Sequence, residues 1–458
     1  MPPAVRTRRA TSVALPSGGA GPTLPPPGRH VKLSPFDTYW ATLPPVRRVF
    51  LFAPPSPSPP VAFADVARAL RTSLAAVLPA FHPFAGLLVY EPESDGVAIL
   101  VGEDASVAFV EAETELEFAR LVEEGTDHDV DALRQLVPDI RREELPAPVM
   151  AAQVTEFVGA GGGIAVGVAL HHTAADGRGL WRFLETWAAA AATAFGSDGR
   201  RAGEEQAPPL HDRRLVRFDG DEELAGVFLR QIAPDLPRLV PKQQDPSPER
   251  AQHQLSRRTF TLGASAVRRL KQQLAAGAGQ APAPSTFAAV VAHGWVSIAR
   301  ASGFTDGDPV FAVFLADCRA HMSPPAPERY AGNCVALCKV ALGGAELAAP
   351  DGHGRACAAV REAVAEVKRD PLGDRGRWVS KFAEIPRGRA VIMAGSPWFL
   401  AHDVDFGFGK PARAELASMN HDGEMVLVAG REAGSVQASV ALAAHKMPAF
   451  QELFVLPG

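Results

Sequence analysis

Apolar residues recur at helical spacing in two stretches of the first half of the chain. In residues 65–78, DVARALRTSLAAVL, apolar residues occupy positions 66, 69, 70, 74, 77 and 78. From Leu180 onward they fall at i, i+3, i+4, i+7, i+8 and i+11. Because this spacing gathers apolar side chains on one helical face, it predicts two amphipathic helices, the second beginning near Gly177.

Runs of apolar residues predict strands around these helices. Residues 149–158 and 164–170 form two such runs, joined by a glycine-rich turn. In the second half, strands are predicted at 257–262, 309–319 and 333–342, and in the later runs EMVLVAG and VQASVAL. Helices are predicted at 264–277 and 285–301, the second capped by Ser285 or Thr286. Mixed strands and helices without regular βαβ alternation favour an α+β fold.

A polar, proline-bearing stretch separates the two halves. Residues 197–250 contain SDGRRAGEEQAPP and PDLPRLVPKQQDPSPER, a composition typical of a linker. We therefore expect an N-terminal domain over 1–196, a crossover linker over 197–250 and a C-terminal domain over 251–458. The first 29 residues hold several arginines and no acidic residue, which fits either an organelle transit peptide or a strand over AVRTRRATSVAL.

Composition and charge narrow the class of protein. The 458 residues are 47% hydrophobic and 21% charged, with a net charge of −5, which is typical of a globular protein. No basic patch dominates, so nucleic acid is not an expected partner. No apolar run approaches the roughly 20 residues that a membrane helix needs. The four cysteines form no CxxC pair and fit a reducing compartment, where we expect them to be buried as small apolar side chains.

A histidine pair and an aspartate lie where the strand predicted at 164–170 meets the helix after it. Residues 171–177 read HHTAADG. Adjacent side chains of a strand face opposite ways, so His171 and His172 cannot share one pocket if the strand continues through both. Asp176 occupies a natural N-cap position. The spacing leaves three interpretations open: a catalytic base, a hydrogen-bonded core histidine beside a capping aspartate, or a metal site that lacks an evident third ligand.

Several motifs, in order along the chain, resemble the plant BAHD acyl-CoA-dependent acyltransferases. HHTAADG carries the HxxxD pattern of that family, and DFGFGKP at 405–411 is similar to its DFGWG motif. The resemblance also includes SPFDTYW, DRRLV, STFAAVVAHGW, YAGNC, GSPWF and AHKMPAFQELF, so it spans most of the chain. YAGNC and GSPWF look like the branch that malonylates anthocyanins and other phenolic glucosides.

The resemblance implies two chloramphenicol-acetyltransferase-like α+β domains with a channel between them. The implied activity moves an acyl group, malonyl for this branch, from acyl-CoA to a hydroxyl of a small phenolic or flavonoid glucoside. No cofactor and no metal are implied, because acyl-CoA is a co-substrate. A cytosolic monomer with no membrane and no nucleic-acid partner is the corresponding expectation.

The resemblance also implies a role for individual residues. His172 becomes the general base, acting without an acyl-enzyme, and Asp176 pairs with Arg319 to hold the loop. The further residues of the structural motifs are Gly177, Asp405, Gly407 and Gly409. The implied acyl-CoA-binding residues are Arg178, Ser256, Lys271 and Lys410, and the implied acceptor pocket contains Phe36, Trp40, Trp398 and Phe408.

Two of these positions affect the expected chemistry. Arg178 follows the HxxxD motif and could read a malonyl carboxylate through charge-assisted bonds beside a helix N-terminus. Phe408 stands where the family usually has Trp, and a phenyl ring cannot donate to an oxyanion as an indole N–H can. Two alternatives to malonyl transfer therefore stay open. One is transfer from acetyl-, benzoyl- or hydroxycinnamoyl-CoA to another alcohol or amine, and the other is a non-catalytic relative that binds small molecules.

Overall fold

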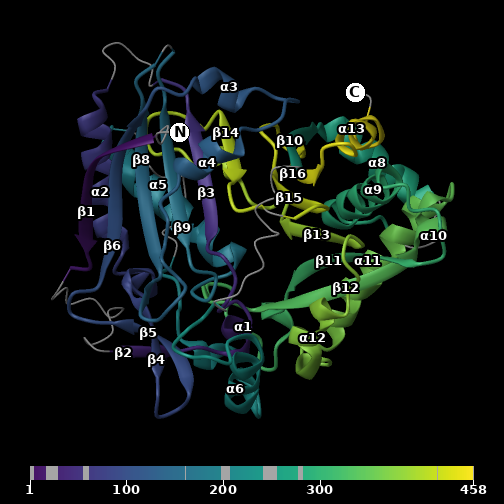
Figure 1. The fold of residues 1–458 in the computed structure, drawn as a ribbon, viewed down its shortest axis with the longest axis horizontal. Helices are drawn as coiled ribbons and strands as arrows, with labels where there is room; N and C mark the ends of the chain where they lie inside the picture. The colour runs from purple at the N-terminus through teal and green to yellow at the C-terminus, as the bar shows by residue number, and fades with distance from the viewer. Residues whose placement is uncertain are drawn as a thin grey trace.

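The structure is a computed structural model that describes residues 5–16, 29–54, 61–159, 161–196, 207–240, 255–276, 282–419 and 421–456. Within these residues, two six-stranded sheets and a smaller four-stranded sheet are packed with helices into two halves that lie side by side (Figure 1). The α+β class with two sheeted domains is therefore confirmed.

The first six-stranded sheet lies in the N-terminal half. Its order is β1 (Val5–Ala14), β6 (Ser106–Thr114), β8 (Met150–Phe157), β9 (Ile164–Leu170), β3 (Val46–Phe52) and β14 (Arg413–Leu416). One face packs against α2 (Phe63–Val77) and α5 (Gly177–Thr193), and the other against α3 (Phe118–Val122) and α4 (Val130–Gln135). Alternate residues of β3 enter these two cores, Phe50 on the α5 side and Val49 on the α4 side, as strand geometry requires.

A smaller sheet and the helices α1 and α6 lie below this sheet in Figure 1. The four-stranded sheet has the order β2 (Arg29–Lys32), β5 (Gly96–Val101), β4 (Leu87–Glu91) and β7 (Ala147–Pro148). The short helix α1 (Pro35–Thr38) and the helix α6 (Asp221–Ile232) lie beside the second half of the molecule. The proline at the start of α1 fits a first helical turn, where its missing N–H costs nothing.

The second six-stranded sheet belongs to the C-terminal half. Its order is β10 (Leu255–Leu262), β16 (Val436–Ala443), β15 (Glu424–Ala429), β13 (Ala390–Gly395), β11 (Pro309–Asp317) and β12 (Val335–Gly343). Its helices are α8 (Ala264–Ala276), α9 (Thr286–Ala301), α10 (Gly344–Ala348), α11 (Gly352–Arg369), α12 (Trp378–Ala383) and α13 (Met447–Phe454). Ser285 caps α9 through its side chain, and residues 288–299 of that helix are all buried.

The structure confirms the predicted elements closely, including the strand over AVRTRRATSVAL, which pairs with β6 as β1. Of the first 29 residues, 1–4 and 17–28 lie outside the described residues, so the transit-peptide alternative stays a prediction. The four cysteines are buried and unpaired, as expected. No helix among the described residues is long and apolar enough to cross a membrane.

The chain does not divide in space as simply as it divides in sequence. In the predicted linker, 197–206 and 241–250 lie outside the described residues, while 207–240 carry helix α6 and buried side chains such as Arg213. The segment 401–416, from the predicted C-terminal domain, packs into the first core and adds β14 to the first sheet. The domain boundaries at 196 and 251 stay a prediction, and the second half of the chain reaches back across the junction.

Candidate active site

The two adjacent histidines occupy the turn between β9 and α5. β9 ends at Leu170, so the strand does not continue through either of them. His171 is fully buried, and its Nδ1 lies 2.9 Å from Thr173 Oγ1. His172 keeps partial exposure, and its ring stacks on Trp40 with the ring centroids 4.1 Å apart. Only His172 is therefore within reach of a substrate.

Burial sets the charge of both imidazoles. Desolvation lowers the pKa of His172, opposed in part by its own backbone carbonyl, Asp176 and Asn333. Burial also lowers the pKa of His171, to about 3, with a contribution from neighbouring His172. A neutral imidazole at neutral pH can accept a proton, so His172 is in the form that a general base requires.

Asp176 is buried, and its carboxylate holds the loop that carries His172 through three hydrogen bonds. Its Oδ1 accepts from Gly179 N at 3.1 Å, which caps α5. Its Oδ2 accepts from Arg319 Nη2 at 2.8 Å and from Cys334 N at 3.1 Å. The ion pair that the resemblance implied between Asp176 and Arg319 is thus present, and the carboxylate has no free face for a metal. Among the described residues, no group of three or more metal-ligating side chains occurs.

A second buried ion pair holds the other side of the same loop. Arg213 Nε donates to Asp37 Oδ2 at 3.2 Å, and its Nη2 donates to the Ala174 carbonyl at 2.7 Å. Asn333 Nδ2 donates both to Asp37 Oδ1 and to the His172 carbonyl, each at 2.9 Å. We name the set Asp37, Asp176, Arg213, Arg319 and Asn333 the His172 clamp. These contacts fix the backbone of residues 172–176 from distant parts of the chain.

Sequence reasoning assigned roles to only part of this clamp. Asp37, Arg213 and Asn333 lie in SPFDTYW, DRRLV and YAGNC, three motifs that supported the family resemblance. Their presence in those motifs was the signal in the sequence that could have identified them as site residues. Nothing in the spacing could show that residues nearly 300 positions apart, such as Asp37 and Asn333, meet in one buried network.

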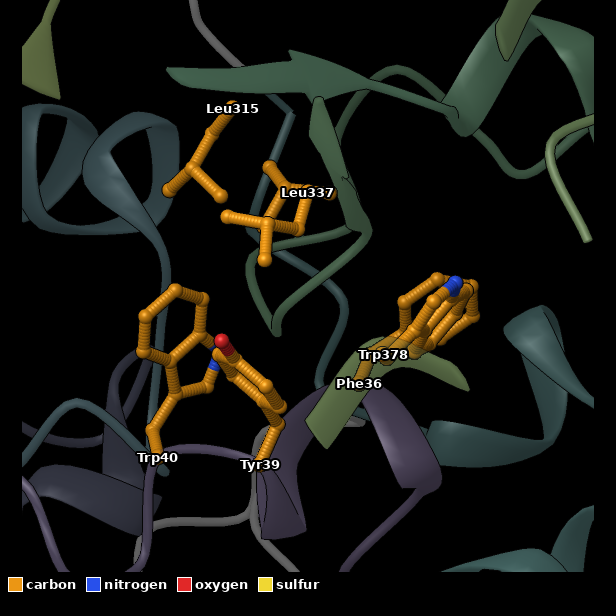
Figure 2. A pocket seen from close by; sticks show the side chains of 7 residues that line it. Phe36, Tyr39, Trp40, Leu315, Leu337 and Trp378 are labelled. Atoms are coloured by element: carbon orange, nitrogen blue, oxygen red, sulfur yellow. The ribbon is translucent and has the colours of Figure 1, made fainter. Parts of the chain in front are cut away.

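An apolar pocket lies beside the clamp, between the two halves of the molecule. Its lining residues come from α1 and the turn after it, from β11, β12 and α12, and are Phe36, Tyr39, Trp40, Leu315, Val335, Leu337 and Trp378. Figure 2 shows the rings of Tyr39 and Trp40 facing Leu315 and Leu337 across this space. Because Trp40 also stacks on His172, the pocket adjoins the candidate base.

The four predicted acceptor-pocket residues separate into two groups. Phe36 and Trp40 line the apolar pocket. Trp398 is 86% exposed, because the loop after β13 turns its neighbour Phe399 inward, onto Trp181. Phe408 packs into the first core against Phe52, with ring centroids 4.8 Å apart. The structure therefore places neither Trp398 nor Phe408 in the pocket that adjoins His172.

The glycines of the two motifs occupy positions that favour glycine, through a positive φ or a close neighbour. Asp405 Oδ1 accepts from Gly407 N at 2.7 Å and Gly409 N at 3.0 Å. Both glycines have positive φ, 99° and 110°, a region that favours glycine. A Cβ on Gly177 would lie 2.8 Å from the Phe399 ring. Asp405 thus ties together the DFGFG loop.

The four residues predicted to bind acyl-CoA are scattered over the surface and the junction. Arg178 pairs with Glu328 at 2.8 Å and Asp317 at 3.4 Å, and Lys410 pairs with Asp403 at 2.8 Å. Ser256 is buried and donates to Asp127. Lys271 is partly exposed on α8. The structure does not bring these side chains together at one place, and their roles stay predictions.

The fold and the histidine at the domain junction define a class, the two-domain α+β transferases. The family model described as the Transferase family matches residues 20–456. The chain therefore belongs to that family, the BAHD acyl-CoA-dependent acyltransferases, which are enzymes that use acyl-CoA to acylate small acceptors.

Among curated relatives, phenolic glucoside malonyltransferase 1 of Arabidopsis thaliana is 26% identical over 91% of each chain. The malonyl-coenzyme A:anthocyanin 3-O-glucoside-6''-O-malonyltransferase of Dahlia pinnata is 28% identical over 94% of each. Among solved structures, vinorine synthase has a TM-score of 0.72 at 19% identity, with 98% of this chain and 97% of that chain covered. This structural match supports the fold.

Proposed function

We propose that this enzyme transfers a malonyl group from malonyl-CoA to a sugar hydroxyl of a phenolic or flavonoid glucoside. The observation that carries the proposal is His172, held by the clamp at the domain junction beside an apolar pocket. The branch-like motifs YAGNC and GSPWF support the malonyl donor. The names of the relatives in Arabidopsis thaliana and Dahlia pinnata support both the donor and the acceptor class.

The chemistry needs a single base. Nδ1 of His172 is buried, so Nε2 is the nitrogen that a substrate can reach and that takes the proton of the acceptor hydroxyl. The freed oxygen attacks the thioester carbonyl carbon and forms the new ester bond. As the C–S bond breaks, the sulfur takes the proton from the imidazolium, CoA leaves as the thiol, and His172 is neutral again.

The lining of the apolar pocket matches the aromatic part of such an acceptor in its chemistry. It is made of aromatic and aliphatic side chains, and its polar groups are the Tyr39 hydroxyl and the indole N–H groups of Trp40 and Trp378, which make no hydrogen bond to the described part of the chain. In the structure this space is closed to about 10 Å³, and Phe36 packs on Trp378 with ring centroids 5.1 Å apart. These side chains must therefore separate before a flat phenolic ring can enter with its glucosyl hydroxyl directed to the imidazole beside Trp40. The rate gain then comes from base catalysis and from holding two substrates in one geometry.

Two other functions remain as outcomes of a test. Another acyl-CoA could be the donor, because the donor preference rests on motifs and relatives. A non-catalytic relative is favoured by Phe408 in place of tryptophan, although its ring lies in the first core. The purified protein should be assayed for release of CoA thiol with malonyl-, acetyl-, benzoyl- and hydroxycinnamoyl-CoA on a set of phenolic glucosides.

The matched variant for this assay is His172→Gln. We expect it to lose about 10²- to 10⁴-fold in kcat, the usual contribution of a general base, while its melting temperature stays near that of the wild type. The same small turnover in both proteins would identify a binding protein instead. Turnover by the wild type that favours acetyl- or hydroxycinnamoyl-CoA would reject the malonyl donor and leave the role of His172 in place.

A further inference from the structure

One buried arginine at the domain junction has no counter-charge. Arg48, on β3, is 6% exposed. Its Nε is buried and makes no hydrogen bond, and no ion pair joins its guanidinium to a carboxylate of the described residues. Buried arginines are almost always paired, because an uncompensated charge away from water costs several kcal/mol. Arg48 is therefore an exception that requires an explanation.

The surroundings of Arg48 place it near the start of α5. Its side chain shares the face of β3 that carries Phe50 toward the α5 core. The guanidinium lies over the Trp181 ring, 5.4 Å from its centroid. Trp181 in turn stacks on Phe399, at 5.5 Å, from the loop that follows β13 of the second domain. Arg48 thus lies where the first sheet, the helix after the His172 loop and the second domain meet.

The nearest opposite charge is already engaged elsewhere. Glu415 pairs in register with Val49, so its side chain leaves the opposite face of the sheet from Arg48. Its oxygens accept from Arg413 at 2.8 Å and from Thr259 and Ser439 at 2.7 Å each. Burial lowers the pKa of Arg48 to about 10, with Glu415 opposing this effect only in part. The guanidinium therefore stays charged at neutral pH.

Arg178 is the arginine that the sequence favoured for binding a carboxylate, and it differs from Arg48 both in exposure and in pairing. Its side chain is 41% exposed and already pairs with Asp317 and Glu328. A solvated, paired guanidinium gains little from a further anion, whereas a buried and unpaired one gains a partner that offsets its desolvation. Binding of a ligand carboxylate therefore favours Arg48 over Arg178.

The strand register relates Arg48 to the His172 loop. Val46 of β3 pairs with Leu170, the residue before His171, and Arg48 pairs with Val168. Arg48 therefore lies two residues along β3 from the start of that loop, and it is not among the aromatic and aliphatic residues that line the apolar pocket. The loop also contacts that pocket, through the stacking of His172 on Trp40.

We propose that Arg48 binds the free carboxylate of the acyl group, and so selects acyl-CoA donors that carry a terminal carboxylate. This inference rests on the proposed function, because it names the residue that reads the malonyl donor. The guanidinium makes a charge-assisted contact with the carboxylate and takes no part in proton transfer. Arg48 is thus a specificity residue.

The test is equilibrium titration of the full-length protein with malonyl-CoA, acetyl-CoA and CoA. In Arg48→Gln we expect the ratio of affinities for malonyl-CoA over acetyl-CoA to fall about 10- to 100-fold, the usual effect of losing hydrogen bonds to a charged group. Arg48→Lys should restore part of the ratio. The matched control is Arg47→Gln, since Arg47 lies next along β3 on the other face and pairs with Asp139.

Each other outcome has a definite meaning. Equal losses for all three ligands would identify a phosphate contact and overturn the proposal. A wild-type preference for malonyl-CoA that survives in Arg48→Gln would overturn it too, while leaving the proposed function intact. A wild type that binds and turns over both donors alike would reject both proposals. A lower melting temperature for Arg48→Met together with an unchanged ratio of affinities for malonyl-CoA over acetyl-CoA would show a purely structural role and overturn it as well.

Discussion

The domain junction contains two buried polar networks of similar composition and different purpose. The His172 clamp balances Asp37 and Asp176 against Arg213 and Arg319, and much of its hydrogen bonding goes to backbone atoms around His172. The second network, which we name the β14 network, consists of Arg413, Glu415, His128, Thr259 and Ser439. It joins β14 of the first sheet to β10 and β16 of the second.

The difference lies in what each network holds. Removing a member of the clamp releases the loop that carries the base, whereas removing a member of the β14 network loosens the attachment of one sheet to the other and leaves the contacts of that loop in place. Both networks are charge-balanced, so both should cost stability when one ion is removed. Only the clamp should also cost turnover, and the following variants test that contrast.

The largest effect is expected for Arg319→Met. Its loss leaves Asp176 buried without an ionic partner, which typically costs about 3–5 kcal/mol, and frees the backbone at 172–176. We expect a strong fall in the free energy of unfolding together with a kcat loss of at least about a hundredfold, since misplacing a catalytic group costs that much. Urea denaturation and kcat measured on one preparation check this.

Asp176→Asn provides the companion measurement. An amide keeps the shape of the N-cap but weakens the bond to Arg319. The loop geometry should suffer more than proton transfer itself. A variant that folds with unchanged stability and KM and yet loses most of its kcat would instead place Asp176 in the chemistry, against the clamp interpretation.

The next largest effect is expected for Glu415→Gln in the β14 network. Arg413 then lies buried without its carboxylate partner, and about 3 kcal/mol of unfolding free energy should be lost. Because the Glu415 side chain leaves the face of the sheet opposite to Arg48 and bonds to Arg413, Thr259 and Ser439 instead of the His172 loop, kcat of the folded fraction should stay within about threefold of the wild type. A kcat loss comparable to that of Arg319→Met would remove the distinction between the two networks.

The β14 network should also make stability depend on pH. Burial lowers the pKa of His128 to about 4, with Arg413 adding to the effect, and its Nε2 lies 2.9 Å from an Arg413 nitrogen that must donate. In the unfolded chain the same group titrates near 6.5. Below that pH the imidazole is protonated in the unfolded state and still neutral in the folded state. The free energy of unfolding therefore falls as the pH falls from 6.5 toward 4.

The expected size is about 2 kcal/mol between pH 7 and pH 5 from this residue. His128→Gln, which keeps a side-chain acceptor, should flatten that part of the profile, measured as unfolding free energy against pH. Buried His171 remains in both proteins and contributes equally. An unchanged slope in His128→Gln would mean that the β14 network does not control acid stability.

The sequence predicted more of the fold than of either network. Helix α5 was evident because its apolar residues repeat at 3.6-residue spacing, and the N-cap at Asp176 because an acidic side chain precedes that repeat. Such patterns could be recognised because the residues that cause the helix are neighbours in the sequence. Motif order then identified the family, which supplied His172 and the pair of Asp176 with Arg319.

The features that the sequence could not predict depend on which residues, far apart along the chain, come into contact in the fold. Nothing local to Arg48 shows that it is buried without a partner, since neighbouring Arg47 has the same charge and pairs with Asp139. Trp398 resembled a pocket residue, yet the loop turned Phe399 inward in its place. Similarly, a β14 strand that returns to the first sheet leaves no trace in the apparent domain boundary.

The smallest expected effects come from a matched pair of neutral donors, one in each network. Asn333 donates to Asp37 and to the His172 carbonyl, and Thr259 donates to Glu415. Asn333→Ala and Thr259→Val should each cost about 1–2 kcal/mol of unfolding free energy, because each leaves a buried acceptor less satisfied. On stability alone the two variants should look alike.

Turnover should separate them, since only Asn333 touches the backbone of the base. We expect kcat of Asn333→Ala to fall about tenfold with little change in KM, because a looser His172 carbonyl lets the imidazole leave its productive orientation. Thr259→Val should keep its kcat within about twofold, as nothing near His172 moves. Equal kcat losses would mean that stability at the junction, rather than the position of one carbonyl, limits the rate, and the two networks would then act as a single unit.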